Sequence, residues 1–586
     1  MASITLTLPE ALKRAIAAYN DGKFSEAERL CHAIIATKRD FFEALHLLAI
    51  VQTKLGCSHD ALASYDRALT IRPDHPPTLN NRGSTLGELK RFEEALASYD
   101  RALALHPDFP EALSNRGNIL RELKRFEEAL ASYDCALKLR PDYAVALSNR
   151  GLVLCDLRRF EEALESCDHA LTLQPDHAAT LNSRGNILRE LKRFEEALAS
   201  YDRALTLQPD YPEALSNRGL ALCDLRRFQE GLACYDRALK LRPDYAVAHH
   251  NEGMCRLMIG DFDRGWEKRE WKSKNWNDFA QPMWLGSKNA DKAILLHARP
   301  MLGFGDTIQF CRYVPLVAER AARVILEVQA SLRGLMSTLA GVVQIVASGE
   351  SLPNFDLHCS LLSLPLAFRT RLETIPCATP YLRVSSQAMM NWNARLGSRG
   401  HPRIGLAWSG NPFNLNDHNR SIKLRSLLSL LDLDATFISL QKDVRAGDAA
   451  VLKARSDVLH FGDELKDFSD TAAIISNLDL IISVDTSVVH LAGALAKPVW
   501  VMLPFIPDWR WLLDREDSPW YPTARLFRQD DSRTWESVIT RVHAALQDLV
   551  RNYASTRTDL NSAGGGQHPP STERRRREGS RAAPAP

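Results

Sequence analysis

Several absences limit what this protein can be. The 586-residue chain has 74 basic and 72 acidic residues, a net charge of +2, so it carries no bulk field for nucleic acid. No long uncharged apolar run occurs, and the opening MASITLTLPEALKRAI has no basic stretch before an apolar core. We therefore expect a soluble cytoplasmic protein without a membrane span or a nucleic-acid partner.

Two classes of motif are also missing. The eleven cysteines form no Cys-x-x-Cys pair, which favours small buried side chains in a reducing compartment over a metal or disulfide framework. No Gly-x4-Gly-Lys-Ser/Thr loop is present, which argues against an ordinary ATPase.

What the sequence has in abundance is a 34-residue period. The dipeptide Pro-Asp recurs with this spacing, and columns of Gly and Phe keep the same register. The prolines are Pro73, Pro107, Pro141, Pro175, Pro209 and Pro243. This period is typical of tetratricopeptide repeats, and a weaker unit around Phe24 extends it to about seven or eight units over residues 5–276.

Each unit predicts an antiparallel helix pair. Phe126, Leu130 and Tyr133 form an apolar stripe at i, i+4 and i+7, and Pro141 stops the second helix. One pair cannot bury its own faces, so we expect the pairs to stack into a solenoid with a concave inner surface.

The pattern changes after the repeats. A linker is predicted at 277–290, followed by two series of buried strands alternating with helices, at 291–385 and 400–550. The expected strands are 293–298, 323–329, 342–348, 404–410, 436–442, 478–485 and 498–504. The fold class is thus an α-solenoid followed by two doubly wound α/β domains that face each other across a cleft. The Ser/Gly/Pro/Arg-rich tail, 552–586, is predicted to be disordered, and its Arg run to be solvated.

In such domains the chemistry lies where strands end and helices begin. In GFGDTIQF two glycines permit a tight turn, and Asp306 is either an N-cap or a general base. In VDTSVVHLAGALAKPVW a strand ends at Asp485, and Thr486 and Ser487 open a helix whose free N–H groups suit a diphosphate. His490 is either a ligand of that group or a packed core histidine.

A second motif, WSGNPFNLNDHNRSIKL, supplies facing groups. Its small polar residues Ser409, Gly410 and Asn411 follow another strand. Arg420 and Lys423 come next and can neutralise phosphate oxygens.

These segments, together with SLQK (439–442) and PDWRW (507–511), resemble the family 9, heptosyltransferase-like glycosyltransferases of GT-B fold over about residues 285–550. With the repeats, the architecture is similar to the protein O-GlcNAc transferases. The resemblance implies an inverting transferase that needs no metal and uses a nucleotide-sugar as donor substrate, with no other cofactor. It implies that Asp306 is the base. The implied donor site consists of Ser409, Gly410, Asn411, Arg420, Lys423, Gln441, Asp485, Thr486, Ser487 and His490.

The repeats offer an acceptor site. One column contains Asn81, Asn115, Asn149, Asn217 and Asn251. A similar Asn ladder in O-GlcNAc transferases binds peptide backbone, and an amide that donates and accepts matches a peptide unit. The alternative is a polar row between repeats, beside a column of Arg that includes Arg116.

Three functions stay open: sugar transfer to a polypeptide presented by the repeats, heptosyltransferase-like transfer to a glycan, and a scaffold with an inactive transferase domain. The donor sugar, the acceptor and the oligomeric state are not set by the sequence.

Overall fold

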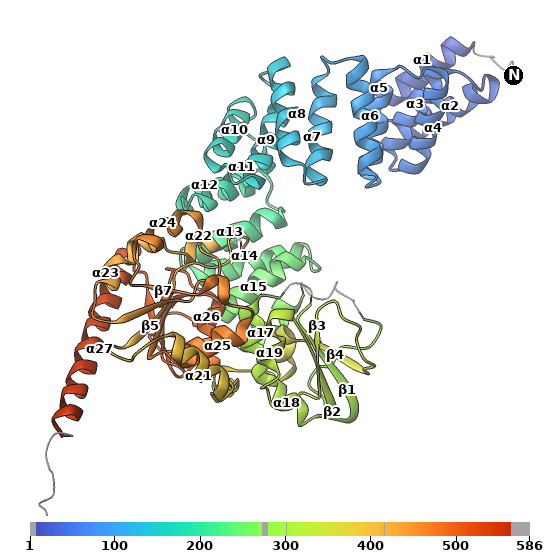
Figure 1. The fold of residues 1–586 in the computed structure, drawn as a ribbon. Helices are drawn as coiled ribbons and strands as arrows, with labels where there is room; N and C mark the ends of the chain where they lie inside the picture. The colour runs from blue at the N-terminus through green and yellow to red at the C-terminus, as the bar shows by residue number, and fades with distance from the viewer. Residues whose placement is uncertain (1–6, 272–278, 300–301, 415, 564–586) are drawn as a thin grey trace, which may run out of the picture. The chain divides into compact units, whose positions relative to one another are not determined.

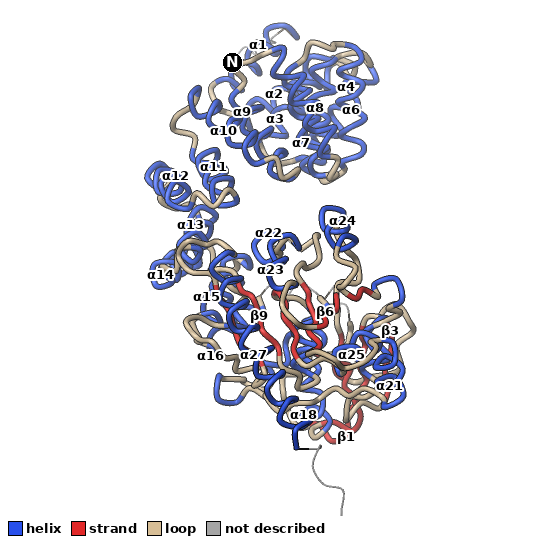
Figure 2. The backbone as a smooth tube through the Cα atoms, turned by 60° about the vertical axis from the view of Figure 1, so that its left-hand side comes forward, coloured by secondary structure: helices blue, strands red, loops and turns tan. Residues whose placement is uncertain are grey.

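The computed structural model describes residues 7–271, 279–299, 302–414 and 416–563. The chain divides into two compact units, Met1–Asn251 and Glu252–Pro586. Figure 2 shows that the first unit consists of helices and loops, whereas the strands belong to the second. Among the described residues, no helix combines the length and apolarity needed to cross a membrane.

The predicted repeats are confirmed. Sixteen helices form eight pairs within the described residues, and successive pairs of the first unit stack side by side (Figure 1). The first five pairs are α1 (Leu8–Asn20) with α2 (Phe24–Thr37), α3 (Phe42–Lys54) with α4 (Ser58–Ile71), α5 (Pro76–Glu88) with α6 (Phe92–Leu105), α7 (Pro110–Glu122) with α8 (Phe126–Leu139), and α9 (Ala144–Asp156) with α10 (Phe160–Leu173). The last three are α11 (Ala178–Glu190) with α12 (Phe194–Leu207), α13 (Pro212–Asp224) with α14 (Phe228–Leu241), and α15 (Ala246–Met258) with α16 (Phe262–Glu270). The boundary between the two units falls inside α15.

The Gly column lets the two helices of a pair touch. A Cβ atom added to Gly117 would lie 2.7 Å from Cζ of Tyr133, whose ring is fully buried. The same contact with a Tyr at i+16 occurs at Gly83, Gly185 and Gly219, whereas Gly151 meets Cys167 and Gly253 meets the backbone of Arg269.

We expect Gly117→Ala to destabilise its repeat by about 1–3 kcal/mol, because an extra methyl group in a packed contact forces Tyr133 to move. Hydrogen exchange of α7 and α8 should rise. Gly447→Ala is the matched control, since a Cβ there meets nothing within 4 Å and exchange should stay the same. Unchanged exchange in Gly117→Ala would contradict this packing account.

The second unit contains two parallel sheets. The first has the order β3-β2-β1-β4 and the second β10-β9-β8-β5-β6-β7. The first sheet contains β1 (Asn289–His297), β2 (Ala321–Val328), β3 (Gln344–Ala347) and β4 (Leu357–Ser360). The second contains β5 (Arg403–Ala407), β6 (Thr436–Ser439), β7 (Leu459–His460), β8 (Leu480–Val484), β9 (Val499–Leu503) and β10 (Ala524–Arg528). The seven predicted strands are present, and β4, β7 and β10 are additional.

The strand orders locate the expected binding positions. Numbered along the chain, the second sheet reads 3-2-1-4-5-6, so the direction of winding reverses between β5 and β8. In the first sheet the reversal lies between β1 and β4. Open α/β sheets bind ligands at the carboxyl ends of the strands at such a reversal.

The helices of the second unit cover these sheets, and one apolar cluster contains residues of both, such as Leu296 of β1 and Ile481 of β8. The helices of the second unit that follow the repeats are α17 (Phe304–Phe310), α18 (Val314–Ala318), α19 (Arg333–Met336), α20 (Leu364–Ala367), α21 (Ser386–Arg395), α22 (Asp417–Arg420), α23 (Leu428–Leu431), α24 (Ala446–Ala454), α25 (Phe468–Ser476), α26 (Ser487–Ala494) and α27 (Glu536–Ala563).

Two predicted segments differ from expectation. The tail boundary at 552 is wrong, because α27 continues to Ala563 and no Gly or Pro interrupts its sequence; residues 564–586 lie outside the described residues. Within the predicted linker, 277 and 278 lie outside them too, but Trp284 is buried and Met283 forms a bridge with His358 of the first sheet.

Candidate functional site

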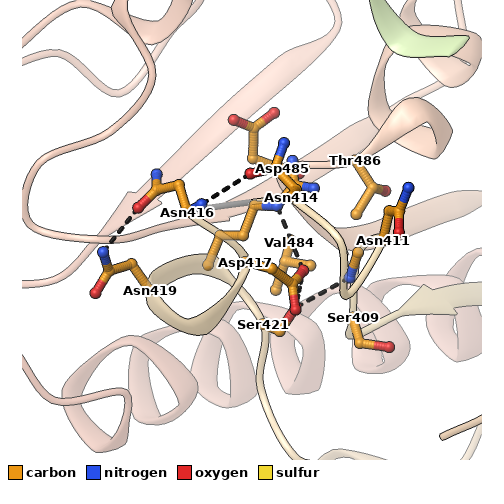
Figure 3. Close-up of polar contacts among 12 residues, drawn as sticks. Ser409, Asn411, Asn414, Asn416, Asp417, Asn419, Ser421, Val484, Asp485 and Thr486 are labelled. Atoms are coloured by element: carbon orange, nitrogen blue, oxygen red, sulfur yellow. Dashed lines mark hydrogen bonds and ion pairs between the residues drawn. The ribbon is translucent and has the colours of Figure 1, made fainter. Parts of the chain in front are cut away.

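The two donor-site motifs meet at one edge of the second sheet. Ser409, Gly410 and Asn411 follow β5, and Asp485 to Ser487 follow the neighbouring strand β8. We call the residues 408–411 and 485–487 the β5–β8 edge. Figure 3 shows that the loop with Asn411 and Asp417 lies beside Asp485 and Thr486. The structure therefore brings these two segments together, and the roles of their residues stay predictions.

Gln441 holds the loop after β5. Its Oε1 accepts hydrogen bonds from the N–H groups of Trp408 (3.1 Å) and Ser409 (3.0 Å). Asn411 Oδ1 accepts from the N–H of Phe413 at 3.0 Å, which shapes the turn that follows. The side-chain carbonyl of Gln441 thus binds the backbone of the loop and holds the β5–β8 edge in position.

Two arginines tie the edge together. Arg420 Nη1 donates to the carbonyl oxygen of Asp485 at 2.8 Å, and a Cβ on Gly410 would lie 2.7 Å from Arg420 Nη2. Arg445 Nη2 donates to the carbonyl of Gly410 at 2.9 Å and pairs with Asp417, which is 5% exposed. Sequence reasoning missed Arg445 and Asp417, although Arg445 lies just beyond the SLQK strand end, where the same rule of strand ends applies.

Buried polar atoms at this edge lack hydrogen-bond partners among the described residues. They include the Ser409 hydroxyl and the Nε atoms of Arg420 and Arg445. A buried polar atom without a partner costs free energy. An anionic ligand accepting from these donors would remove that cost.

The start of α26 presents backbone donors. Thr486 is the N-cap, but its hydroxyl contacts Ser483 Oγ at 3.2 Å instead of the first N–H groups of the helix. Those N–H groups point out of the helix toward the edge. The Thr486 side chain therefore does not cap the helix, and the helix start has the form of an anion site.

Asp485 and His490 lie behind this helix start. Burial, followed by the charge of Asp508, raises the pKa of Asp485 to about 6. His490 Nδ1 lies 2.9 Å from the hydroxyl of Tyr521, and its ring stacks on Trp511. Burial lowers the pKa of His490 well below its usual value, so the ring is neutral. These contacts match the interpretation of His490 as a packed histidine.

Asp306 is not the N-cap of its helix. Gly303 takes that place and Asp306 is the third residue of α17. One carboxylate oxygen accepts from the Gly303 N–H at 3.2 Å, and the other forms an ion pair with Arg510. Gly303 has the extended conformation of an N-cap, so α17 begins three residues earlier than it would if Asp306 capped it.

The Asp306 turn follows β1, beside the reversal point of the first sheet. Gln329, just after β2, donates to the carbonyl of Leu302 at 2.6 Å and accepts from the Thr307 hydroxyl at 3.0 Å. A Cβ on Gly305 would lie 2.7 Å from His490 Cδ2 and 3.4 Å from Ser487 Cα. The turn that carries Asp306 therefore packs directly against the start of α26.

Lys423 is an exposed residue of the predicted donor site. It follows Ile422, whose N–H donates to the carbonyl of Trp408 at 2.8 Å, so its backbone lies next to the β5–β8 edge. Its assignment as a phosphate ligand stays a prediction.

The Asn column connects neighbouring repeats. Asn115 Nδ2 donates to Asn80 Oδ1 at 3.1 Å, and Asn217 Nδ2 donates to Asn182 Oδ1 at 3.0 Å. The side-chain donors of Asn149 and Asn251 also reach the preceding repeat, and Asn81 accepts from Asn80. The column lies on the first helices of the pairs, which contact one another directly, as α7 contacts α5 and α9.

The Arg column links neighbouring repeats through ion pairs. Arg116 Nε donates to Asp100 of the preceding repeat at 2.6 Å, and its Nη1 donates to Ser132 of its own repeat at 2.6 Å. Arg82, Arg150, Arg184 and Arg218 repeat this pattern. The Asn and Arg columns thus both make the contacts between repeats that the alternative describes, and acceptor binding by the Asn column stays a prediction.

Family models decide the nature of the first unit. Models described as tetratricopeptide repeats match residues 40–108 and 142–210, 80–144, and 212–245. The N-terminal region consists of tetratricopeptide repeats.

The chain is also similar to Protein FlbA of Caulobacter vibrioides, at 25% identity over 324 residues. The match covers 50% of this chain and 54% of FlbA, so the chain spans about half the length of that relative.

Similar solved structures are repeat proteins. A tetratricopeptide repeat protein from Parabacteroides merdae has 19% identity and a TM-score of 0.37, over 42% of this chain and 98% of that one. YrrB, described as having an unusual peptide-binding site, has 23% identity and a TM-score of 0.27, over 32% of this chain and 96% of its own.

Proposed function

We propose that the second unit is a glycosyltransferase of GT-B type that transfers a sugar from a nucleotide-sugar to an acceptor hydroxyl. The observation that supports this most is the position of the two predicted motifs. Asp306 follows the central strand of one sheet, the donor-site segments occupy the reversal point of the other, and Gly305 touches the first turn of α26. This contact supports the proposal, because the proposed base and the proposed diphosphate site belong to segments that pack against each other.

In the proposed reaction, Asp306 accepts the proton of the acceptor hydroxyl as that oxygen attacks the anomeric carbon. The new C–O bond forms while the bond from the anomeric carbon to the phosphate oxygen breaks. The electron pair leaves with the nucleoside diphosphate. Its charge is stabilised by the N–H groups of α26 and by Arg420 and Arg445, as fixed donors stabilise developing charge. One displacement inverts the anomeric configuration.

We propose that the acceptor is a polypeptide held by the repeats. Tetratricopeptide repeats are typical of protein-interaction scaffolds, and the solved protein YrrB is itself described as a peptide binder. The Asn side chains donate between repeats, so each Oδ1 of Asn115, Asn149 and Asn217 is the atom left to accept a hydrogen bond from a peptide N–H.

The triple substitution of Asn115, Asn149 and Asn217 by Ala should weaken polypeptide binding by about 1–3 kcal/mol, the combined value of a few lost hydrogen bonds. Nucleotide binding should stay unchanged. Fluorescence anisotropy with acceptor peptides measures the first effect and calorimetry the second. Equal peptide affinity in the triple variant would remove the Asn column from the acceptor site.

Intact-mass analysis of candidate polypeptides co-expressed with this chain tests the function. A fixed mass increment that requires Asp306 is the expected result and would identify the sugar class. Transfer to small glycans by a chain truncated before residue 240, with no modified polypeptide, would instead favour the heptosyltransferase-like function.

A scaffold with an inactive transferase domain is the second candidate. The ion pair of Asp306 with Arg510 favours it, because the guanidinium occupies a carboxylate oxygen that the proposed base would offer to the acceptor hydroxyl.

A further inference from the structure

Arg510 connects the two halves of the proposed active site. It lies in the short helix Trp509–Trp511, and its side chain is 10% exposed. The guanidinium forms an ion pair with Asp306, donates to Gln309, and donates to Asp508 at 2.8 Å. Asp306 and Gln309 belong to α17 beside the first sheet, whereas Arg510 follows β9 of the second.

The same guanidinium lies close to the helix start proposed for the diphosphate. The residue before Asp306, Gly305, is in contact distance of Ser487 and His490. The charge of Arg510 contributes to lowering the pKa of His490, after burial. Burial lowers the pKa of Arg510, and the charges of Asp508, Asp306 and, least, Asp485 raise it. A diphosphate at Ser487 would therefore lie within the electrostatic reach of Arg510.

A second arginine stands behind this cluster. Burial, and then the charge of Arg510, lower the pKa of Arg269, and the charges of Asp306 and Asp508 oppose that change. Arg269 Nη1 donates to the carbonyl of Leu362 at 3.3 Å, which holds it in place. Arg269 is thus a second buried cation in the electrostatic surroundings of Asp306 and Asp508.

We propose that Arg510 is shared between Asp306 and the donor diphosphate. In the structure it neutralises Asp306, and a bound diphosphate draws the guanidinium to itself, which frees the carboxylate to take the acceptor proton. This inference rests on the proposed function. Arg510 is a positioning residue in it, and it makes donor binding the step that activates the base.

The inference predicts that a substitution of the proposed base increases the affinity for a nucleoside diphosphate. Asp306→Asn should tighten the binding of a nucleoside diphosphate by roughly fivefold or more, the lower range for coupled sites, because the diphosphate no longer competes with Asp306 for Arg510. Arg510→Gln should weaken binding by about tenfold, the loss of one charge-assisted contact. In the double variant, Asp306→Asn should bring no gain.

Calorimetric titration of the full chain with UDP, GDP and ADP provides the test. Arg510→Lys keeps the charge and should recover part of the affinity that Arg510→Gln loses. Arg510→Met, which also removes the charge, replaces Arg510→Gln in the cycle if that variant does not fold. Asp517→Asn is the matched control, since Asp517 pairs with Arg515 in an ion pair downstream of Arg510, and it should not change affinity.

An unchanged or weakened affinity in Asp306→Asn, or the same gain with and without Arg510, would overturn the inference while leaving the proposed function intact. If the wild-type chain binds none of the three nucleotides, the proposed function fails and this inference fails with it.

Discussion

Replacing Asp306 by Asn is expected to lower the rate of sugar transfer by about 10²–10⁴-fold, the usual contribution of a general base. Asn is close to Asp in size and still accepts a hydrogen bond from the Gly303 N–H, so the turn before α17 should persist. Release of nucleoside diphosphate from the donor, followed in the presence of acceptor, measures the rate.

Asp263→Asn is the control for this substitution. Asp263 is an exposed partner of Arg371, with 60% of its side chain accessible, and transfer should remain at the wild-type rate. If Asp306→Asn turns over as fast as the wild type, Asp306 is not the base, and another group near the start of α17 must take the proton.

Replacing Ser487 by Asp should abolish nucleoside diphosphate binding, with a loss of about 100-fold or more. A carboxylate in the first turn of α26 would occupy the anion site, and two like charges about 4 Å apart repel by about 4 kcal/mol at an effective dielectric constant of 20. The same substitution favours the helix dipole, so the protein should unfold at an equal or slightly higher temperature. Calorimetry and a thermal melt without nucleotide measure the two effects.

The matched control is Ser386→Asp. Ser386 is the first residue of α21, as Ser487 is of α26, and it is exposed. The dipole effect is therefore the same, and nucleotide affinity should not change. Equal affinity in both variants would show that the diphosphate does not bind at α26.

Much of the fold follows from periodic features of the sequence. The Pro and Gly columns recur every 34 residues because each repeat solves the same packing problem, such as the contact of Gly117 with Tyr133. The buried strands β5 and β8 are apolar runs followed by polar residues, and β9 is an apolar run between two prolines, so the sequence identifies all three. By contrast, β7 has two residues and β10 reads Ala-Arg-Leu-Phe-Arg, so neither gives an uninterrupted apolar run.

The candidate site was predictable in its segments and not in its contacts. The rule of strand ends located Asp306, Ser409 and Asp485, because it depends only on where a strand stops. The ion pair of Asp306 with Arg510 joins residues 204 positions apart, and no local pattern specifies such a pair. The Arg column shows the same limit, since the sequence indicates a polar row but does not specify that Arg116 links two repeats through Asp100 and Ser132.

A thermal-shift titration of the full chain with UDP-, GDP- and ADP-sugars tests the central claim most directly, namely that the β5–β8 edge binds a nucleotide-sugar. One nucleotide class at 100 times its dissociation constant should stabilise the chain by about 2.7 kcal/mol, and Ser487→Asp should remove that shift. The absence of a shift with every donor would contradict the transferase and favour the scaffold.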